Sequence, residues 1–337
     1  MKNIFKNKKI LITGGTGSIG EITIKELLKY EPSVIRILDL DETRQFELQE
    51  ELKEHENKLR FLLGNVCDKE RLSIAMEGID IVFHMAALKH VFSCEYNPFE
   101  AVKTNVIGTQ NIIDVAMEKE VEKVIFTSSD KAVSPCNVMG ATKLLGERMI
   151  TAANYYKGSK KTQFSSVRFG NVIGSRGSII PLFKKQIKKG GPLTITDKGM
   201  TRFIMSTQQA VNLLLKATEI AQCGEIFVFK MLVTRPIDLA NTMIEEMGGN
   251  KIELKTIGAK PGEKMYEELM TAEEAKRALE TKDMFIILPE IDEVLLEVDR
   301  SYYPTMKEAE QKNYSSANII PISKEELKNL LKKENLL

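Results

Sequence analysis

Three side chains that can carry a proton stand close together in this sequence. Asp130 and Lys131 are neighbours, and Lys143 follows Met139 by four residues. That spacing puts the side chains of Met139 and Lys143 on one face of a helix. A carboxylate and an amine can exchange protons, whereas methionine has none to give. The segment therefore predicts acid–base chemistry carried by Asp130 and Lys131, with Lys143 beside them.

A glycine-rich turn at residues 14–20 is the second segment that could take part in the protein's chemistry. It reads Gly-Gly-Thr-Gly-Ser-Ile-Gly, directly follows the apolar run 8–13 and opens a helical pattern. Glycines let backbone amides approach a pyrophosphate, and the helix N-terminus adds a favourable dipole. We expect a bound dinucleotide here, held by Gly14, Thr16, Gly17, Ser18, Ile19 and Gly20.

The identity of the dinucleotide depends on Asp39, at the end of the second apolar run. Its carboxylate would accept hydrogen bonds from the adenosine ribose and repel a 2′-phosphate. No arginine follows at once, since Leu40 and Asp41 come next. The pattern favours NAD over NADP. The alternative is that Asp39 merely caps the helix beginning near Asp41.

Elements that would position these residues alternate along the first half of the chain. Apolar runs typical of buried strands alternate with amphipathic helices, with strands expected at 8–13, 34–40, 59–64, 79–87, 123–129 and 162–170 and helices at 17–30, 41–55, 69–77, 97–120 and 137–156. This alternation predicts an α/β fold with a doubly wound parallel sheet. We expect a cofactor domain at 1–170, to which 202–229 returns, and a smaller, interwoven lobe at 171–337.

Composition excludes several classes of protein. The chain has 337 residues, 43% hydrophobic and 28% charged, with a net charge of +1, which gives no global attraction to nucleic acid or membrane. No apolar run reaches the roughly 18 residues of a membrane span, and the N-terminus does not resemble a signal peptide. Four scattered cysteines and three histidines predict free thiols and no metal site. We therefore expect a cytoplasmic protein.

Several motifs together resemble one family. The glycine spacing is that of the extended short-chain dehydrogenases/reductases, and the chain is similar to their UDP-N-acetylglucosamine 4,6-dehydratases in the segments TSSDKAVSPCNVMGATK, FHMAALKHV, KTNVIGT, VRFGNVIGSRGSIIPLF, MTRFIM and PGEKMYEEL. The resemblance implies a Rossmann-type sheet with a C-terminal substrate lobe, and UDP-N-acetylglucosamine as the substrate. It also implies a homo-oligomer, for which the helices within 93–118 and 137–157 are candidates.

The resemblance also implies a reaction without net redox change. Hydride leaves sugar carbon 4 for NAD⁺, water is eliminated across carbons 5 and 6, and the hydride returns to carbon 6. In this scheme Lys131, with a lowered pKa, removes the proton at carbon 5, and Asp130 protonates the departing hydroxyl. Ser129 would hold the 4-oxygen and Lys143 the nicotinamide ribose. Met139 replaces the usual tyrosine and would form an apolar wall.

Further candidates surround these groups. Residues after the third and fourth strands are expected to contact the cofactor, namely Asn65, Val66, Ala86 and Ala87. Substrate contacts are expected from Lys89, His90, Asn105, Arg168, Asn171, Arg202 and Lys264, because arginine forks and other polar groups suit a diphosphate. The alternative for each charged side chain is a surface salt bridge, and for Asn105 a satisfied polar residue within a helix.

Three functions remain open from the sequence. The first is the dehydratase, with the segment 37–52 resembling members that retain configuration at carbon 5. The second is a UDP-sugar 4-epimerase or reductase of the same superfamily, which would normally keep the tyrosine. The third is a non-catalytic NAD-binding protein, against which the retention of Asp130, Lys131 and Lys143 argues.

Overall fold

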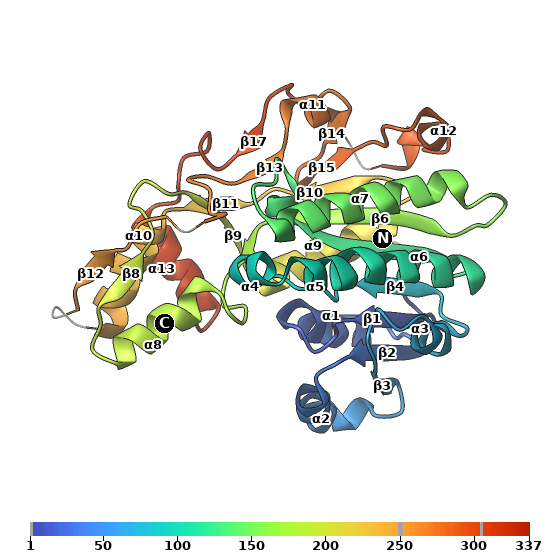
Figure 1. Cartoon of the computed structure of the whole chain (residues 1–337), viewed down its shortest axis with the longest axis horizontal. Coiled ribbons are helices and arrows are strands. Elements are labelled where there is room, and N and C mark those ends of the chain that lie inside the picture. Colours follow the sequence, from blue (N-terminus) through green and yellow to red (C-terminus); the bar gives the residue numbers. More distant parts are fainter. Residues whose placement is uncertain (1–2, 249–251, 260, 304–305) are drawn as a thin grey trace.

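A ten-stranded sheet forms the centre of the computed structural model, which describes residues 3–248, 252–259, 261–303 and 306–337. Six parallel strands lie in the order β3-β2-β1-β4-β5-β6 (Figure 1), with bounds β1 Lys9–Thr13, β2 Val34–Asp39, β3 Leu59–Leu63, β4 Ile81–His84, β5 Lys123–Ser129 and β6 Gln163–Phe169. This is the strand order of the doubly wound dinucleotide-binding fold. The predicted α/β fold class is confirmed.

Helices cover both faces of this sheet, as strands buried on both sides require. The covering helices are α1 Ser18–Leu28, α2 Glu42–Glu51, α3 Lys69–Met76, α6 Gly108–Glu118, α7 Val138–Tyr156 and α9 Thr207–Ile220. Helix α1 packs beside α9, and α3 beside α6 (Figure 1). Every residue of β4 and β10 (Ile226–Phe229) is buried, which explains their continuous apolar character.

The single helix expected over 97–120 is interrupted. Before it comes α4 (Val91–Tyr96), then α5 (Pro98–Val102), a π-helical turn (Lys103–Ile107) and α6. Asn105 lies in the π-helical turn and is buried, with hydrogen bonds to the backbone of Leu88 in the loop after β4. Such turns within helices are common near functional sites.

The second half of the chain completes the same sheet. Strand β10 pairs parallel with β6, and β15 (Met284–Ile287), β14 (Ala278–Glu280) and β16 (Lys307–Glu308) extend it antiparallel. Of the segment 202–229, β10 joins the main sheet, whereas β9 (Arg202–Met205) pairs with β7 (Asn171–Val172) and β11 (Leu232–Thr234) in a separate sheet. The two halves are therefore interwoven.

A smaller lobe has its own apolar core. It contains α8 (Ile179–Lys188), α10 (Pro236–Met243), α13 (Lys324–Lys333) and a short sheet of β8 (Leu193–Ile195) and β12 (Leu254–Thr256), grouped beyond the end of the main sheet in Figure 1. Other short elements are β13 Glu268–Met270, β17 Tyr314–Ser315, α11 Ala272–Ala275 and α12 Asp292–Leu295. Within the described ranges, no helix combines the length and apolarity that crossing a bilayer would need.

Arg168 belongs to the core and not to a ligand site, which corrects the prediction that it binds a diphosphate. Its side chain is 1% exposed and forms ion pairs with Glu147 at 2.6 Å and Glu274 at 3.0 Å. A third contact reaches the carbonyl of Leu269. Because these acceptors occupy the guanidinium, Arg168 connects β6 to α7, to α11 (Ala272–Ala275) and to β13 (Glu268–Met270).

We predict that Arg168→Met lowers the free energy of unfolding by about 3–5 kcal/mol, because it leaves the buried carboxylate of Glu147 without its cation. Denaturant unfolding followed by circular dichroism measures the difference. Lys276→Met is the control, since its pair with Glu273 is exposed and should contribute under about 1 kcal/mol. Equal stabilities of the Arg168 variant and the wild type would contradict this role.

Candidate active site

A cleft of about 640 Å³ lies at the carboxyl ends of the parallel strands. Its walls include most of the predicted site residues, namely Gly14, Thr16, Gly17, Ser18, Ile19, Gly20, Asp39, Asn65, Val66, Ala86, Ala87, Lys89, His90, Ser129, Asp130, Lys131, Met139, Lys143 and Asn171. Residues far apart in the sequence meet here because parallel strands present their carboxyl ends at one edge.

The glycine-rich turn brings backbone close to the cleft. Gly14 has φ +70°, and a Cβ on it would lie 2.7 Å from the amide nitrogen of Ala86. A side chain at this position would therefore clash with the loop after β4. Gly17 is the N-cap of α1 and brings no side chain to the helix N-terminus. The turn has the shape and dipole of a pyrophosphate cradle.

Asp39 faces this turn from the end of β2. Its Oδ2 accepts hydrogen bonds from the backbone nitrogen and Oγ1 of Thr16, at 3.0 and 2.7 Å. The cap of helix α2 is Asp41, whose carboxylate accepts from the amide of Arg44. The structure therefore excludes the alternative that Asp39 is only a helix cap.

The end of β5 carries a compact polar cluster. Ser129 Oγ donates to Asp130 Oδ1 at 2.6 Å and accepts from the amide of Lys131. Lys131 Nζ donates to both oxygens of Asp130, at 3.0 and 3.2 Å. Asp130 is 4% exposed, so this ion pair is largely shielded from water. Because the hydroxyl of Ser129 is already committed to Asp130, it orients the carboxylate.

The expected low pKa of Lys131 is not found. Burial disfavours its charge, but the carboxylates of Asp130 and Glu267 outweigh that effect and raise the pKa of the amine above its usual value. Glu267 Oε1 lies 3.9 Å from Lys131 Nζ. Lys131 is therefore an ammonium ion in the absence of ligand.

Met139 and Lys143 share a face of α7, as their spacing predicts. Met139 is 4% exposed and packs with Cys94 and Ala101. Lys143 Nζ donates to the carbonyl of Thr127 at 2.9 Å. Burial lowers the pKa of Lys143 to about 8, with Glu147 opposing the change. Lys143 therefore loses its proton more readily than an exposed lysine does.

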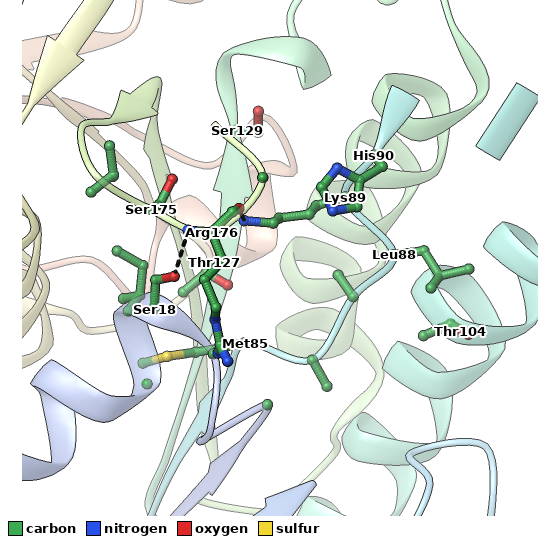
Figure 2. Close-up of a pocket in the computed structure, with 18 of the residues that line it drawn as sticks. Ser18, Met85, Leu88, Lys89, His90, Thr104, Thr127, Ser129, Ser175 and Arg176 are labelled. Atoms are coloured by element: carbon green, nitrogen blue, oxygen red, sulfur yellow. Dashed lines mark hydrogen bonds between the residues drawn. The ribbon is translucent and has the colours of Figure 1, made fainter. Parts of the chain in front are cut away.

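Two cations flank the other side of the cleft. Lys89 Nζ donates to the carbonyl of Arg176 at 2.9 Å, and the guanidinium of Arg176 reaches the carbonyl of Thr16 in the glycine-rich turn. Figure 2 shows Arg176 and Lys89 lying close together, with the amide of Arg176 bonded to Ser18. Burial, and then the charge of Arg176, lower the pKa of Lys89. An anion placed between these cations would relieve their repulsion.

Three further predicted substrate residues lie outside the cleft wall. Asn105 is buried and bonded to Leu88 and Thr142, so it shapes the loop after β4 and does not contact a ligand directly. Arg202 pairs with Glu267 at 3.4 Å. Lys264 donates to the carbonyl of Val133. These partners, together with those of Arg168, hold the four side chains in the framework.

Three residues in or near the cleft were not predicted from the sequence. Ser128 lines the cleft, and its buried hydroxyl finds no hydrogen-bond partner in the part of the chain that the structure describes. Arg176 and Glu267 lie within segments that carry the family resemblance, but the site residues predicted in those segments were their neighbours. The sequence could have indicated both residues, because each is a charged residue inside a segment that resembles the family.

Comparisons with known proteins agree with this geometry. The model of the family described as "Polysaccharide biosynthesis protein" matches residues 10–289. A UDP-N-acetylglucosamine 4,6-dehydratase (inverting) of Campylobacter jejuni is 43% identical, covering 88% of each chain. A UDP-glucose 4-epimerase of Rickettsia rickettsii is 39% identical, covering 97% of this chain and 96% of that protein.

Solved structures also resemble this chain. The X-ray structure of Pen from Bacillus thuringiensis is 50% identical, with a TM-score of 0.91 over 98% of this chain and 99% of that one. DesIV, a dTDP-glucose 4,6-dehydratase of Streptomyces venezuelae with NAD and TYD bound, shares the fold at 20% identity, with a TM-score of 0.69 over 76% and 86%. The chain therefore belongs to the polysaccharide biosynthesis protein family, within the extended short-chain dehydrogenases/reductases, as its motifs predicted.

Proposed function

We propose that this protein is a UDP-N-acetylglucosamine 4,6-dehydratase that works with bound NAD. The observation that carries the proposal is the shielded Asp130–Lys131 ion pair, which lies in the cleft beside Met139, where a tyrosine would otherwise act. A relative that is 43% identical over 88% of this chain bears the same activity in its name. An acid and an amine side by side suit an elimination, which needs one proton removed and one delivered.

The cleft has features that fit NAD. Gly14 and Gly17 would leave room for a pyrophosphate at the N-terminus of α1, and Asp39, which lines the same cleft, would accept hydrogen bonds from the ribose hydroxyls. The Ser128 hydroxyl, which has no hydrogen-bond partner among the described residues, and the amine of Lys143 line the same cleft, and the nicotinamide end would bind beside them. When bound, NAD would accept a hydride from the sugar and return it to the sugar. The negative charge of Asp39 argues against the 2′-phosphate of NADP.

Asp130 and Lys131 can reach the protonation states that elimination requires. Moving one proton from Lys131 Nζ to Asp130 along their 3.0 Å contact breaks an N–H bond and forms an O–H bond. The neutral amine can then take the proton from sugar carbon 5, and the acid can donate to the oxygen leaving carbon 6. This transfer is uphill, because the neighbouring carboxylates raise the pKa of Lys131, so the neutral amine and the neutral acid form only transiently.

Lys89, Arg176 and Asn171 would bind the diphosphate and sugar of the substrate. Lys89 and Arg176 are cations held at one wall of the cleft, and Asn171 lies on the wall near Glu267. Lysine and arginine bind phosphate oxygens by charge-assisted hydrogen bonds. A UDP-sugar is the substrate class that supplies such a diphosphate.

A UDP-sugar 4-epimerase is the second candidate function, because a relative of that name is 39% identical over 97% of this chain. Epimerisation rearranges one carbon and needs no acid for a leaving hydroxyl, so it gives no role to Asp130. The mass of the product separates the two reactions, since dehydration removes one water.

We predict that the NAD-loaded protein converts UDP-N-acetylglucosamine into a 4-keto-6-deoxy product lighter by one water, and leaves the mass of UDP-glucose unchanged. Mass spectrometry measures both. NMR in deuterated water adds the configuration at carbon 5, for which we propose retention; inversion would match the named Campylobacter jejuni relative. A product isomeric with its substrate would replace the dehydratase with the epimerase.

Lys131→Ala and Asp130→Asn should each lower the dehydration rate by a factor of about 100 or more, because each removes a proton-transfer group. Both should keep NAD affinity, since neither forms the glycine-rich turn. Initial rates and NAD titrations measure these effects, with Lys276→Ala as the exposed control. Unchanged rates in both variants would refute the role of the pair.

Asp39→Ala should weaken NAD binding by a factor of about 10–100, because it removes a charged acceptor of ribose hydroxyls. Its preference for NAD over NADP should narrow as the repulsion of the 2′-phosphate disappears. Calorimetric titration with both dinucleotides measures the change. Asp68→Ala, which removes a carboxylate that caps α3 and does not line the cleft, controls for lost stability. Equal binding of NADP and NAD by the wild type would contradict the assignment.

A further inference from the structure

Glu267 is a second carboxylate beside Lys131, and no step proposed above uses it. Its Oε1 lies 3.9 Å from Lys131 Nζ, compared with 3.0 Å for the nearest oxygen of Asp130. The Glu267 side chain is only 8% exposed, and it does not belong to the residues lining the cleft within the described ranges. It therefore contacts Lys131 from within the protein and not from the ligand side.

The position of Glu267 is fixed by contacts along both its backbone and its side chain. Its backbone nitrogen donates to Ser316 Oγ at 2.9 Å, and its carbonyl accepts from the amide of Ser316 at 2.8 Å. Its carboxylate accepts from Asn171 Nδ2 at 2.8 and 2.9 Å and from the amide of Phe203 at 2.9 Å. Such a carboxylate is oriented before any substrate arrives.

Among the residues that the structure describes, three charged side chains act on Lys131. Asp130 and Glu267 supply two carboxylates, and Arg202, 3.4 Å from Glu267, supplies a second cation. Asn171, the other polar side chain on Glu267, is uncharged. Burial and the nearby carboxylate of Asp130 raise the pKa of Glu267 to about 7, with Lys131 and Arg202 opposing the change. Above pH 7 Glu267 is therefore mostly negative, and its attraction on Lys131 is present.

We propose that Glu267 is a positioning residue for Lys131: it holds the ammonium group between its own carboxylate and that of Asp130, and so controls how readily the amine gives up its proton. The consequence for catalysis rests on the proposed function, in which Lys131 must become neutral. Without a bound ligand, Glu267 thereby keeps Lys131 protonated and paired with Asp130.

The size and sign of the effect follow from the geometry. An opposite charge within about 4–6 Å stabilises an ammonium ion by one to three pKa units. Replacing Glu267 by glutamine removes that charge and keeps a side chain of similar shape. The Lys131 amine should then lose its proton at lower pH. At pH 9 the neutral, reactive fraction of Lys131 should rise by a factor of about ten or more.

The test is competitive labelling of lysines in the full chain with acetic anhydride between pH 8 and 11, read for each lysine by peptide mass spectrometry. In Glu267→Gln we expect Lys131 to react at least about tenfold faster at pH 9 than in the wild type. Glu268→Gln is the matched control, since this neighbouring carboxylate bonds Asn313 and should leave Lys131 unchanged. Equal reactivity of Lys131 in wild type and Glu267→Gln overturns the proposal.

A second variant keeps the test decisive if Glu267→Gln does not fold. Arg202→Gln removes a cation that lowers the pKa of Lys131, so Lys131 should react more slowly than in the wild type. Faster or unchanged labelling there would overturn the proposal as well. If Glu267 and Arg202 had only structural roles, the two substitutions would not change the labelling rate of Lys131 in opposite directions.

Activity provides a separate readout. The pH at which dehydration reaches half its maximal rate should fall in Glu267→Gln by the same interval as the labelling curve of Lys131. The labelling shift does not depend on turnover, so it decides the role of Glu267 even if wild-type protein gives no dehydration product. Absence of that product in the wild type would instead refute the proposed function.

Discussion

The ion pair between Asp130 and Lys131 is the interaction on which the rest of the site depends. It stands where β5 ends, and β5 is held between β4 and β6 in the middle of the sheet. Helix α7 then packs so tightly that a Cβ on Gly140 would lie 2.1 Å from the carbonyl of Lys131. Sheet and helix together fix where the carboxylate and the amine point.

Both halves of the chain build this centre. Asp130 and Lys131 follow β5, whereas Asn171, Arg202 and Glu267 come from segments after residue 170. The strands that join the main sheet late in the chain, β14 and β15, hold that second half against the first. The glycine-rich turn thus lies within the first 170 residues, whereas Arg202 and Glu267, which act on the charge of Lys131, come later in the chain.

The local arrangement of charged side chains in the cleft matters more than the net charge of the chain. The chain is nearly neutral, with a net charge of +1. Within the cleft, however, Lys89 lies beside Arg176, whose guanidinium is 3.8 Å from Glu21, while Lys131 contacts the carboxylates of Asp130 and Glu267. The first arrangement suits an incoming anion, and the second suits an internal proton transfer. Burial strengthens the second arrangement, because Asp130 and Glu267 are shielded from water, whereas Lys89 is exposed.

The sequence alone determined the parallel α/β fold, the glycine-rich turn and the grouping of Asp130, Lys131, Met139 and Lys143, because these depend on local patterns and on short spacing. The tertiary structure decided those features that depend on contacts between residues far apart in the sequence. It placed Arg168 in a buried ion pair, showed that Asp41 and not Asp39 caps α2, and brought Glu267 to Lys131. A side chain's partners and pKa depend on which segments fold against it, and residue type and spacing do not specify those segments.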